Sequence, residues 1–455
     1  MYNFDPNKEA GHTEKLLKEW KPILEHKDYA PIHDRYRRMQ TAIILENTRN
    51  ECLRESAPTN AIGTSSSTAG AGGIDTYDPV LIGLIRRAAP NMMAYDFMGV
   101  QAMKMPTGLV FSLRSTYKNQ ESAAGERDAT EAFYREANSA WSGQSANATS
   151  GTVNAGSPWS ANVVAGSAFE GNAAASDFNY GTGMDTYAAE ALGDARTNDF
   201  NEMAFTIDKT TVTAKSRALK AEYTMELAQD LKAVHGLDAE SELANILSTE
   251  ILAEINREMI RRLYYGAKRG CINGQTATNY IFNLDVDSNG RWSVEKFKGL
   301  AFQIEREANA IAKDTRRGKG NILITSSDVA SALQMTGVLE FNPQYAAALN
   351  IDDTGSTFAG TIGRMKVFID PYYISNGSEF AVVGYKGTSP FDAGAWYCPY
   401  VPLQMVRAVG ENSFQPKIGF KTRYGYVVNP FVNTTGSVVA GENYYYRRFS
   451  VTNLL

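Results

Sequence analysis

Between Leu237 and Gly270 the sequence predicts one long helix, the feature that most restricts what this 455-residue chain can fold into. Apolar side chains recur there at every fourth position, namely Leu243, Leu247, Ile251, Ile255, Met259 and Leu263. Asp238 can cap the helix, acidic residues follow in its first turn, and basic residues including Lys268 and Arg269 come towards its end, which suits the helix dipole. A helix about 40 Å long with one apolar stripe needs other elements to cover that stripe.

Composition limits the class of protein. The chain carries 45 Lys+Arg against 50 Asp+Glu, a net charge of −5, whereas a dedicated nucleic-acid binder normally has a basic excess. No apolar run approaches the roughly 20 residues of a membrane span, and the N-terminus lacks a signal-peptide core, so no membrane insertion is expected. The length allows two or three compact units.

Cysteine and histidine are scarce. The three cysteines lie far apart and are odd in number, which indicates reduced thiols in a cytoplasmic environment. Three of the four histidines lie within the first 33 residues, so His235 is the only imidazole left if that segment is removed. A hydrolase with a Ser-His or Cys-His pair would then depend on one residue, which counts against an enzyme.

Between Arg291 and Phe391 the sequence predicts alternating helices and strands. The patterns predict helices at 294–312 and 327–335, and strands at 321–325, 365–369 and 380–383. Earlier in the chain, period-two alternation predicts a strand at 109–117 and a return strand at 203–215. Asp78 and Pro79 can begin a short helix that ends near Pro90.

Two blocks of sequence are similar to a known family. They are DPVLIGLIRRAAPNMMAYDFMGVQAMKMPTGLVFSLRSTY, from Asp78 to Tyr117, and AWYCPYVPLQMVRAVGENSFQPKIGFKTRYGYVVNPF, from Ala395 to Phe431. Both resemble the major capsid proteins of T4-type tailed phages, which have the HK97-type capsid fold. The resemblance implies an α+β fold with an N-arm, an extended loop, a P-domain whose spine is the long helix, and an A-domain.

The resemblance also implies the following domains. They are a helical leader at 1–55, an N-arm at 56–105, an extended loop at 106–136 and 200–225, a small β-rich insertion domain at 137–199, a P-domain at 226–295, an A-domain at 296–394, and return strands to the P-domain at 395–455. The stretch 137–199 is dominated by Ala, Ser, Gly, Asn and Thr, but five spaced aromatic residues favour a folded insertion over a flexible linker.

Residues 1–55 differ from the remainder. Charges of both signs are dense, apolar residues recur at helical spacing, and Pro22 and Pro31 divide the stretch into two amphipathic helices. A docked helical hairpin and a detachable leader both fit. The phrase YRRMQTAIILENT at 36–48 resembles the leader of T4-type capsid proteins, whose prohead proteases cut after Glu with an aliphatic residue two positions earlier. Leu53, Glu55 and Ser56 fit that pattern, and a Ser/Thr/Gly/Ala-rich run follows.

The function implied by this resemblance is a precursor of the major capsid protein. Its copies would form hexamers of an icosahedral head in the host bacterial cytoplasm, become part of the virion capsid, and mature by removal of the leader. The implied partners are a pentameric vertex protein, an internal scaffold bound through the leader, a prohead protease, decoration proteins, and packaged DNA held without sequence-specific contacts. No cofactor is expected. The related vertex protein or an encapsulin-like shell protein is the nearest alternative, although the leader disfavours the encapsulin.

Several motifs are weak signs of a metal-binding or catalytic site. Asp285, Asp287 and Asn289 alternate before a glycine, as at the start of a calcium loop, but Lys296 occupies the position of the bidentate Glu and a polar turn accounts for the same letters. This loop is the weak candidate for a metal, and no metal site is predicted.

Asp353 begins an aspartic-protease-like tetrapeptide that has no second copy. A cytoplasmic hydrolase centred on Asp353 or on the 285–289 loop is the remote alternative. Lys118 is the only lysine near the loop for an HK97-type crosslink, and none is proposed.

Overall fold

The computed structural model describes residues 6–26, 31–55, 86, 92–116, 132–133, 142, 183–184, 186–193, 200, 203–271, 280–288, 290–341, 357–370, 372, 378–388, 392–410, 415–432 and 436–454. The chain is α+β and forms two compact units. The first comprises 1–110, 210–314 and 318–455, and the second comprises 111–209 with 315–317. Among the described residues, no helix combines the length and the apolar character that crossing a membrane requires.

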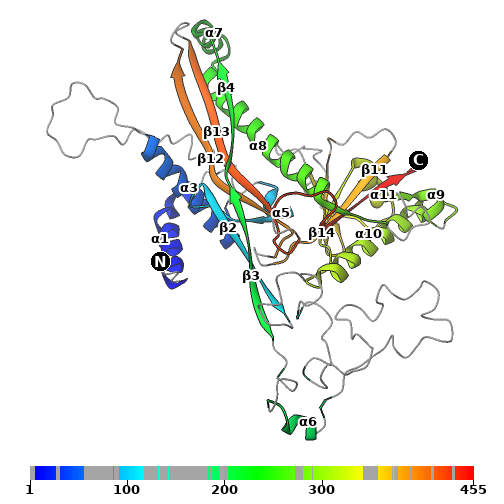
Figure 1. Cartoon of the computed structure of the whole chain (residues 1–455). Helices are drawn as coiled ribbons and strands as arrows, with labels where there is room; N and C mark the ends of the chain where they lie inside the picture. Colours follow the sequence, from blue (N-terminus) through cyan, green and yellow to red (C-terminus); the bar gives the residue numbers. More distant parts are fainter. Residues whose placement is uncertain are drawn as a thin grey trace. The chain divides into compact units, whose positions relative to one another are not determined.

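A four-stranded sheet in the first unit has the order β1-β12-β13-β4. β12 (Ala395–Val409) and β13 (Pro416–Val428) are long antiparallel partners, and β4 (Lys215–Glu222) pairs antiparallel with β13. β1 (Gly99–Val100) pairs parallel with β12. Figure 1 shows β12, β13 and β4 running side by side. The family-like tail therefore forms the centre of this sheet.

The long helix α8 (Ala239–Gly266) contacts β4 and β13. Asp238 caps it by accepting a hydrogen bond from the Glu240 N–H, which confirms the predicted start. Of the predicted stripe, Ile251, Ile255, Met259 and Leu263 are buried, whereas Leu243 and Leu247 are half-buried.

The predicted end of that helix is wrong. The helix stops at Gly266, and the next residues form β5 (Ala267–Arg269). Lys268 and Arg269 therefore lie in a strand instead of in the last helical turn. The reason is tertiary, because β5 pairs with β14 (Asn443–Thr452), and sheet pairing with a distant segment overrides a helical pattern.

The second sheet of this unit has the order β5-β14-β11-β7-β10-β9-β8, with β6 paired to β14. Its further strands are β6 (Ile281–Asn283), β7 (Ile322–Thr325), β8 (Glu340–Phe341), β9 (Thr357–Ile362), β10 (Met365–Ile369) and β11 (Ser378–Gly384). The helices between them are α9 (Leu284–Asp287), α10 (Ser293–Thr315) and α11 (Ser327–Met335). The predicted helices and strands between 294 and 383 are thus confirmed, with β10 and α11 matching residue for residue.

The final strand β14 pairs with β11, which belongs to this second sheet. The tail 395–455 therefore divides between two sheets, since β12 and β13 belong to the other one. Between β4 and α8 lies α7 (Met225–His235), which Thr224 caps and which Gly236 ends at a φ of 68°.

In the second unit, the described segments are few. β2 (Thr107–Thr116) and β3 (Ala204–Thr213) form a two-stranded sheet, part of which belongs to this unit. This sheet confirms the predicted pair of strands. Here they expose Phe111, Leu113, Phe205 and Ile207. Of the expected insertion at 137–199, little beyond α6 (Thr186–Glu190) lies within the described residues. Apart from Arg86, the expected helix after Asp78 lies outside them.

Candidate functional site

The N-terminal helices pack into the body of the first unit. They are α1 (Pro6–Glu19), α2 (Lys21–Leu24) and α3 (Arg35–Glu55), and α3 contacts α1 and β12. Six successive residues of α3, Gln40 to Leu45, are all buried. A helix buried at consecutive positions is enclosed on more than one side. The prediction of an amphipathic helix is therefore wrong for α3, because the body covers its polar positions as well.

Three polar side chains of α3 fix it to the segment 99–103 and to β12, which together form what we call the α3 groove. The Asn47 amide donates to the backbone oxygens of Met103 at 2.7 Å and of Tyr400 at 3.1 Å. The Ala102 N–H donates to Gln40 Oε1 at 2.8 Å, and the Tyr36 hydroxyl donates to the Val100 oxygen. These bonds satisfy backbone groups that would otherwise be buried without partners, and that requirement fixes the register of the helix.

The shorter helices close over α3. Leu16, Trp20 and Leu24 are buried in the main core, and the Trp20 indole donates to Glu46 Oε2 at 3.1 Å. Arg86, which lies some thirty residues beyond the end of α3, donates to the Leu24 backbone oxygen at 2.9 Å. Residues on both sides of the expected cleavage point thus contribute to one packed region.

A cavity of about 360 Å³ lies where α3 begins, and both α3 and the body line it. Lys386 lines it from the body and donates from Nζ to the Tyr95 backbone oxygen. Burial lowers the pKa of Lys386 to about 8. Arg37 pairs with Asp96 across this region at 3.0 Å. Burial raises the pKa of Tyr36, so its hydroxyl stays protonated and able to donate.

The expected processing residues lie at the end of this arrangement. Leu53 and Glu55 belong to the last turn of α3, which ends at Glu55. Ser56 lies outside the described residues, as do Asp353 and Lys118. A protease that binds an extended substrate must therefore unwind the last helical turn before it can cut after Glu55.

The two described carboxylates of the weak metal candidate, Asp285 and Asp287, already have other partners. The carboxylate of Asp285 pairs with Lys296, and Asp287 Oδ2 accepts from the Asn283 N–H at 2.9 Å. Asn289 lies outside the described residues. Within the described parts of the chain, no three His, Cys, Asp or Glu side chains gather as a metal site would require. The segment forms the short helix α9 capped by Asn283, where a turn was expected.

Sequence reasoning missed the polar residues that anchor α3. Gln40 and Asn47 lie on either side of the apolar stretch Ala42–Leu45, and Lys386 lies far away in the chain. Polar residues beside Ala42–Leu45 are the one signal that could have indicated buried hydrogen bonds. Their partners could not be found from the sequence, because Asn47 and Tyr400 are 353 positions apart.

The comparisons with known proteins agree with one another. Residues 74–451 match the family model described as major capsid protein Gp23. The major capsid protein of Serratia phage KSP90 is 38% identical over 464 aligned positions, which cover 97% of this chain and 98% of the relative. That of Enterobacteria phage T4 is 35% identical over 520 positions, covering 97% and 99%. The capsid vertex protein of T4 is 27% identical over 251 positions, covering 51% and 55%.

Solved phage structures also align with this chain, at low TM-scores and low sequence identity. The chain aligns with the capsid of Myoviridae phage XM1 at a TM-score of 0.38 and 9% identity, covering 79% of this chain and 92% of that one. A chain of Mycobacterium phage Bobi gives a TM-score of 0.37 and 10% identity, with coverages of 79% and 90%.

The family match and the full-length relatives define the class as a structural protein of a bacteriophage capsid. Within that class, this chain belongs to the Gp23 family of major capsid proteins. It is therefore a virion component that builds the phage head from many copies of itself, and it is not a hydrolase or another enzyme.

Proposed function

We propose that this chain is the precursor of the capsid protein, that it has the HK97-type fold, and that its copies form the hexamers of an icosahedral head. The domains would be those inferred from the sequence, with α8 as the spine of the P-domain. The greater similarity to major capsid proteins than to the vertex protein supports a role in hexamers. A pentameric vertex protein and packaged DNA would complete the head.

We propose further that residues 1–55 are a leader that a separate prohead protease removes by cutting after Glu55. The observation that carries this proposal is that α3 ends at Glu55, where the aliphatic-x-Glu-small pattern occurs. Exposed charged side chains of α1, such as Lys15 and Glu19, would remain available to an internal scaffold.

Removal of this leader would lower the free energy of unfolding of the subunit. The leader contributes large buried side chains to the main core, among them Trp20, Ile44 and Leu45. Each such side chain stabilises by roughly 1.5–3 kcal/mol relative to exposure. The cleaved subunit would expose the α3 groove, and repacking of that groove against the subunit's own arm or another copy would drive maturation and make it irreversible.

Intact-mass measurement of purified particles tests this proposal. The unaltered chain should give a main species that starts at Ser56, and Glu55→Gln should give particles that retain residue 1 and fail to expand. Glu51→Gln is the matched control, because it removes another carboxylate from the same helix outside the cleavage pattern. A different first residue in mature particles, or normal cleavage of the Glu55→Gln chain, would contradict the assignment.

A further inference from the structure

Almost all of the charged residues that line a large pocket in the first unit are basic. Its volume is about 1070 Å³, and α8, β4, β13, β14 and the 436–438 loop contribute to its walls. Five basic side chains line it against the single carboxylate of Glu258; they are Lys215, Arg217, Arg261, Arg262 and Arg448. We call it the basic pocket. Its charge is opposite in sign to the net charge of −5 of the whole chain.

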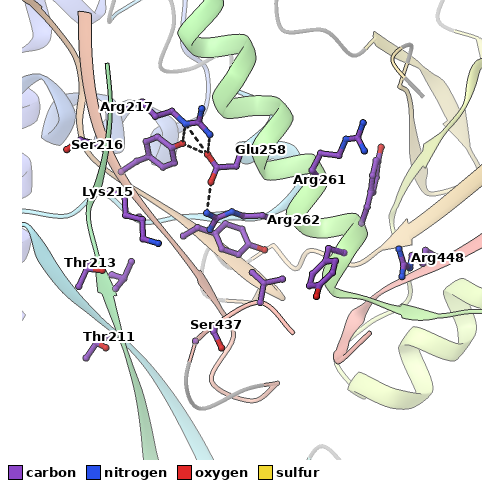
Figure 2. Close-up of a pocket in the computed structure, with 18 residues that line it drawn as sticks. Thr211, Thr213, Lys215, Ser216, Arg217, Glu258, Arg261, Arg262, Ser437 and Arg448 are labelled. Carbon is purple, nitrogen blue, oxygen red and sulfur yellow. Dashed lines mark hydrogen bonds and ion pairs between the residues drawn. The ribbon is translucent and has the colours of Figure 1, made fainter. Parts of the chain in front are cut away.

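Two of the five cations are already paired. Glu258 Oε2 accepts from Arg217 Nη2 at 2.5 Å, and Glu258 Oε1 lies 2.5 Å from Arg262 Nη2. The Tyr424 hydroxyl donates to the same carboxylate. Of the contacts dashed in Figure 2, those from Arg217 and Tyr424 fix α8 to the sheet, whereas the Arg262 contact lies within α8. Glu258 therefore already has two cationic partners and does not neutralise the other three.

The other three cations have no carboxylate partner among the described residues. Lys215 and Arg261 are exposed at the start of β4 and on α8, and Arg448 lies on β14. The Nε of Arg448 is buried without a hydrogen-bond partner. Figure 2 shows these three side chains on different elements around the pocket. A surplus of three positive charges, together with the unsatisfied Nε of Arg448, favours an anionic ligand.

The donors suit phosphate groups better than an isolated carboxylate. Guanidinium groups form paired hydrogen bonds with phosphate oxygens, and hydroxyl groups such as those of Thr213 and Ser216 also line the pocket. The volume is large enough for several phosphates, and the exposed ring of Tyr265 adds an aromatic face. A capsid subunit that encloses a genome meets such phosphates in nucleic acid.

We propose, on the basis of the proposed packaging of DNA in the head, that the basic pocket binds the phosphate backbone of that nucleic acid without reading its sequence. Lys215, Arg261 and Arg448 carry this contact, while Arg217 and Arg262 hold the walls in place through Glu258. Backbone contacts of this kind position nucleic acid and give binding that weakens steeply with salt. The acidic chain would thereby hold DNA at separate points and repel it elsewhere.

The test measures binding of a 20-base-pair duplex to the full, unassembled chain as a function of salt. Lys215→Gln with Arg261→Gln removes two exposed pocket charges and leaves the Glu258 contacts intact. The slope of log K against log salt should fall by about 1.8, so that the affinity loss between 50 and 200 mM salt shrinks roughly tenfold. The control pair Arg291→Gln with Lys298→Gln removes one Arg and one Lys that are also exposed, the first just before α10 and the second in α10. This control should leave the slope unchanged.

Other results overturn the proposal. An equal loss in the control pair would mean diffuse electrostatic binding. Binding of inorganic tripolyphosphate without duplex binding would assign the pocket to a free phosphate compound. Competition by a poly-glutamate peptide at the same concentration as duplex would assign it to an acidic segment of another protein. If the double variant fails to fold, Lys215→Gln alone should lower the slope by about 0.9.

Discussion

The long helices α3 and α8, two of several in the chain, differ in how their neighbours cover them. α8 buries one stripe and exposes its other face, as shown by Ile255 at 1% exposure and Ile246 at 61%. α3 is buried at six successive positions and is anchored by hydrogen bonds to distant backbone groups. The helix proposed to be discarded is thus the more enclosed of the two. Under the proposed processing, a segment that belongs to the core of the precursor would be absent from the finished shell.

The largest effect is expected at the stripe of α8. Ile255→Asp places an unpaired charge where the side chain is almost fully buried, which should cost more than about 4 kcal/mol and give insoluble subunits. Ile246→Asp on the opposite face of the same helix should change the free energy of unfolding by about 0.5 kcal/mol or less. Solubility and urea unfolding of both variants give the measurement. Equal behaviour of the two would show that the buried face of α8 is misassigned.

The next effect sharpens the comparison at α3. Leu45→Ala should lower the free energy of unfolding of the full chain by about 2–5 kcal/mol, because Leu45 is 1% exposed and leaves a cavity. The substituted residue lies in the proposed leader, so mature particles that have lost it should melt like the unaltered ones. A full chain unaffected by Leu45→Ala would mean that α3 does not belong to its core.

A smaller effect is expected from the anchoring amide. Asn47→Ala leaves the oxygens of Met103 and Tyr400 without this donor and should cost about 1–3 kcal/mol in urea unfolding of the full chain. Asn50→Ala is the control, since Asn50 is exposed on the same helix. Matching losses for both would point to helix propensity as the cause.

The smallest effect concerns pH and the walls of the basic pocket. Burial alone would raise the pKa of Glu258, but hydrogen bonds from Tyr424 and Arg217 and the charge of Arg262 outweigh it and lower the pKa below 4.5. The unfolded chain binds this proton more readily, so the stabilisation is complete above about pH 4.5 and disappears as pH falls through the lowered pKa.

Glu258→Gln should therefore lower the free energy of unfolding at pH 7 by about 1 kcal/mol, and the difference from the unaltered chain should vanish in acid. Glu250→Gln, an exposed carboxylate on the same helix, is the control. Urea unfolding between pH 3 and 7 checks both. A Glu258→Gln deficit that persists unchanged in acid would show that the carboxylate acts through packing and not through its charge.

Much of the fold was predictable because its signals are local. The stripe of α8, the cap at Asp238 and the span of α11 all follow from spacing within one segment. The burial of α3 on several sides could not be predicted, because Gln40 and Asn47 have the polar character of a solvated face and their partners lie in distant segments. The end of α8 was missed for the same reason, because pairing between β5 and β14 decides it.

The basic pocket was missed as well. Its cations come from two strands and a helix, and the net charge of −5 argued against any contact with nucleic acid. Only the fold brings Lys215, Arg261 and Arg448 around one hollow. The processing pattern at 53–56, in contrast, is a motif of neighbouring residues that the sequence alone indicates, and cleavage there remains a prediction.

Hydrogen exchange of the full, unassembled chain tests most directly whether α3 is part of the core. Amides that open only when the whole domain unfolds exchange slowly, whereas an undocked helix exchanges quickly. We expect the amides of residues 41–48 to exchange as slowly as those of residues 251–263 in α8. Exchange at 41–48 within seconds, while 251–263 remain protected, would contradict it.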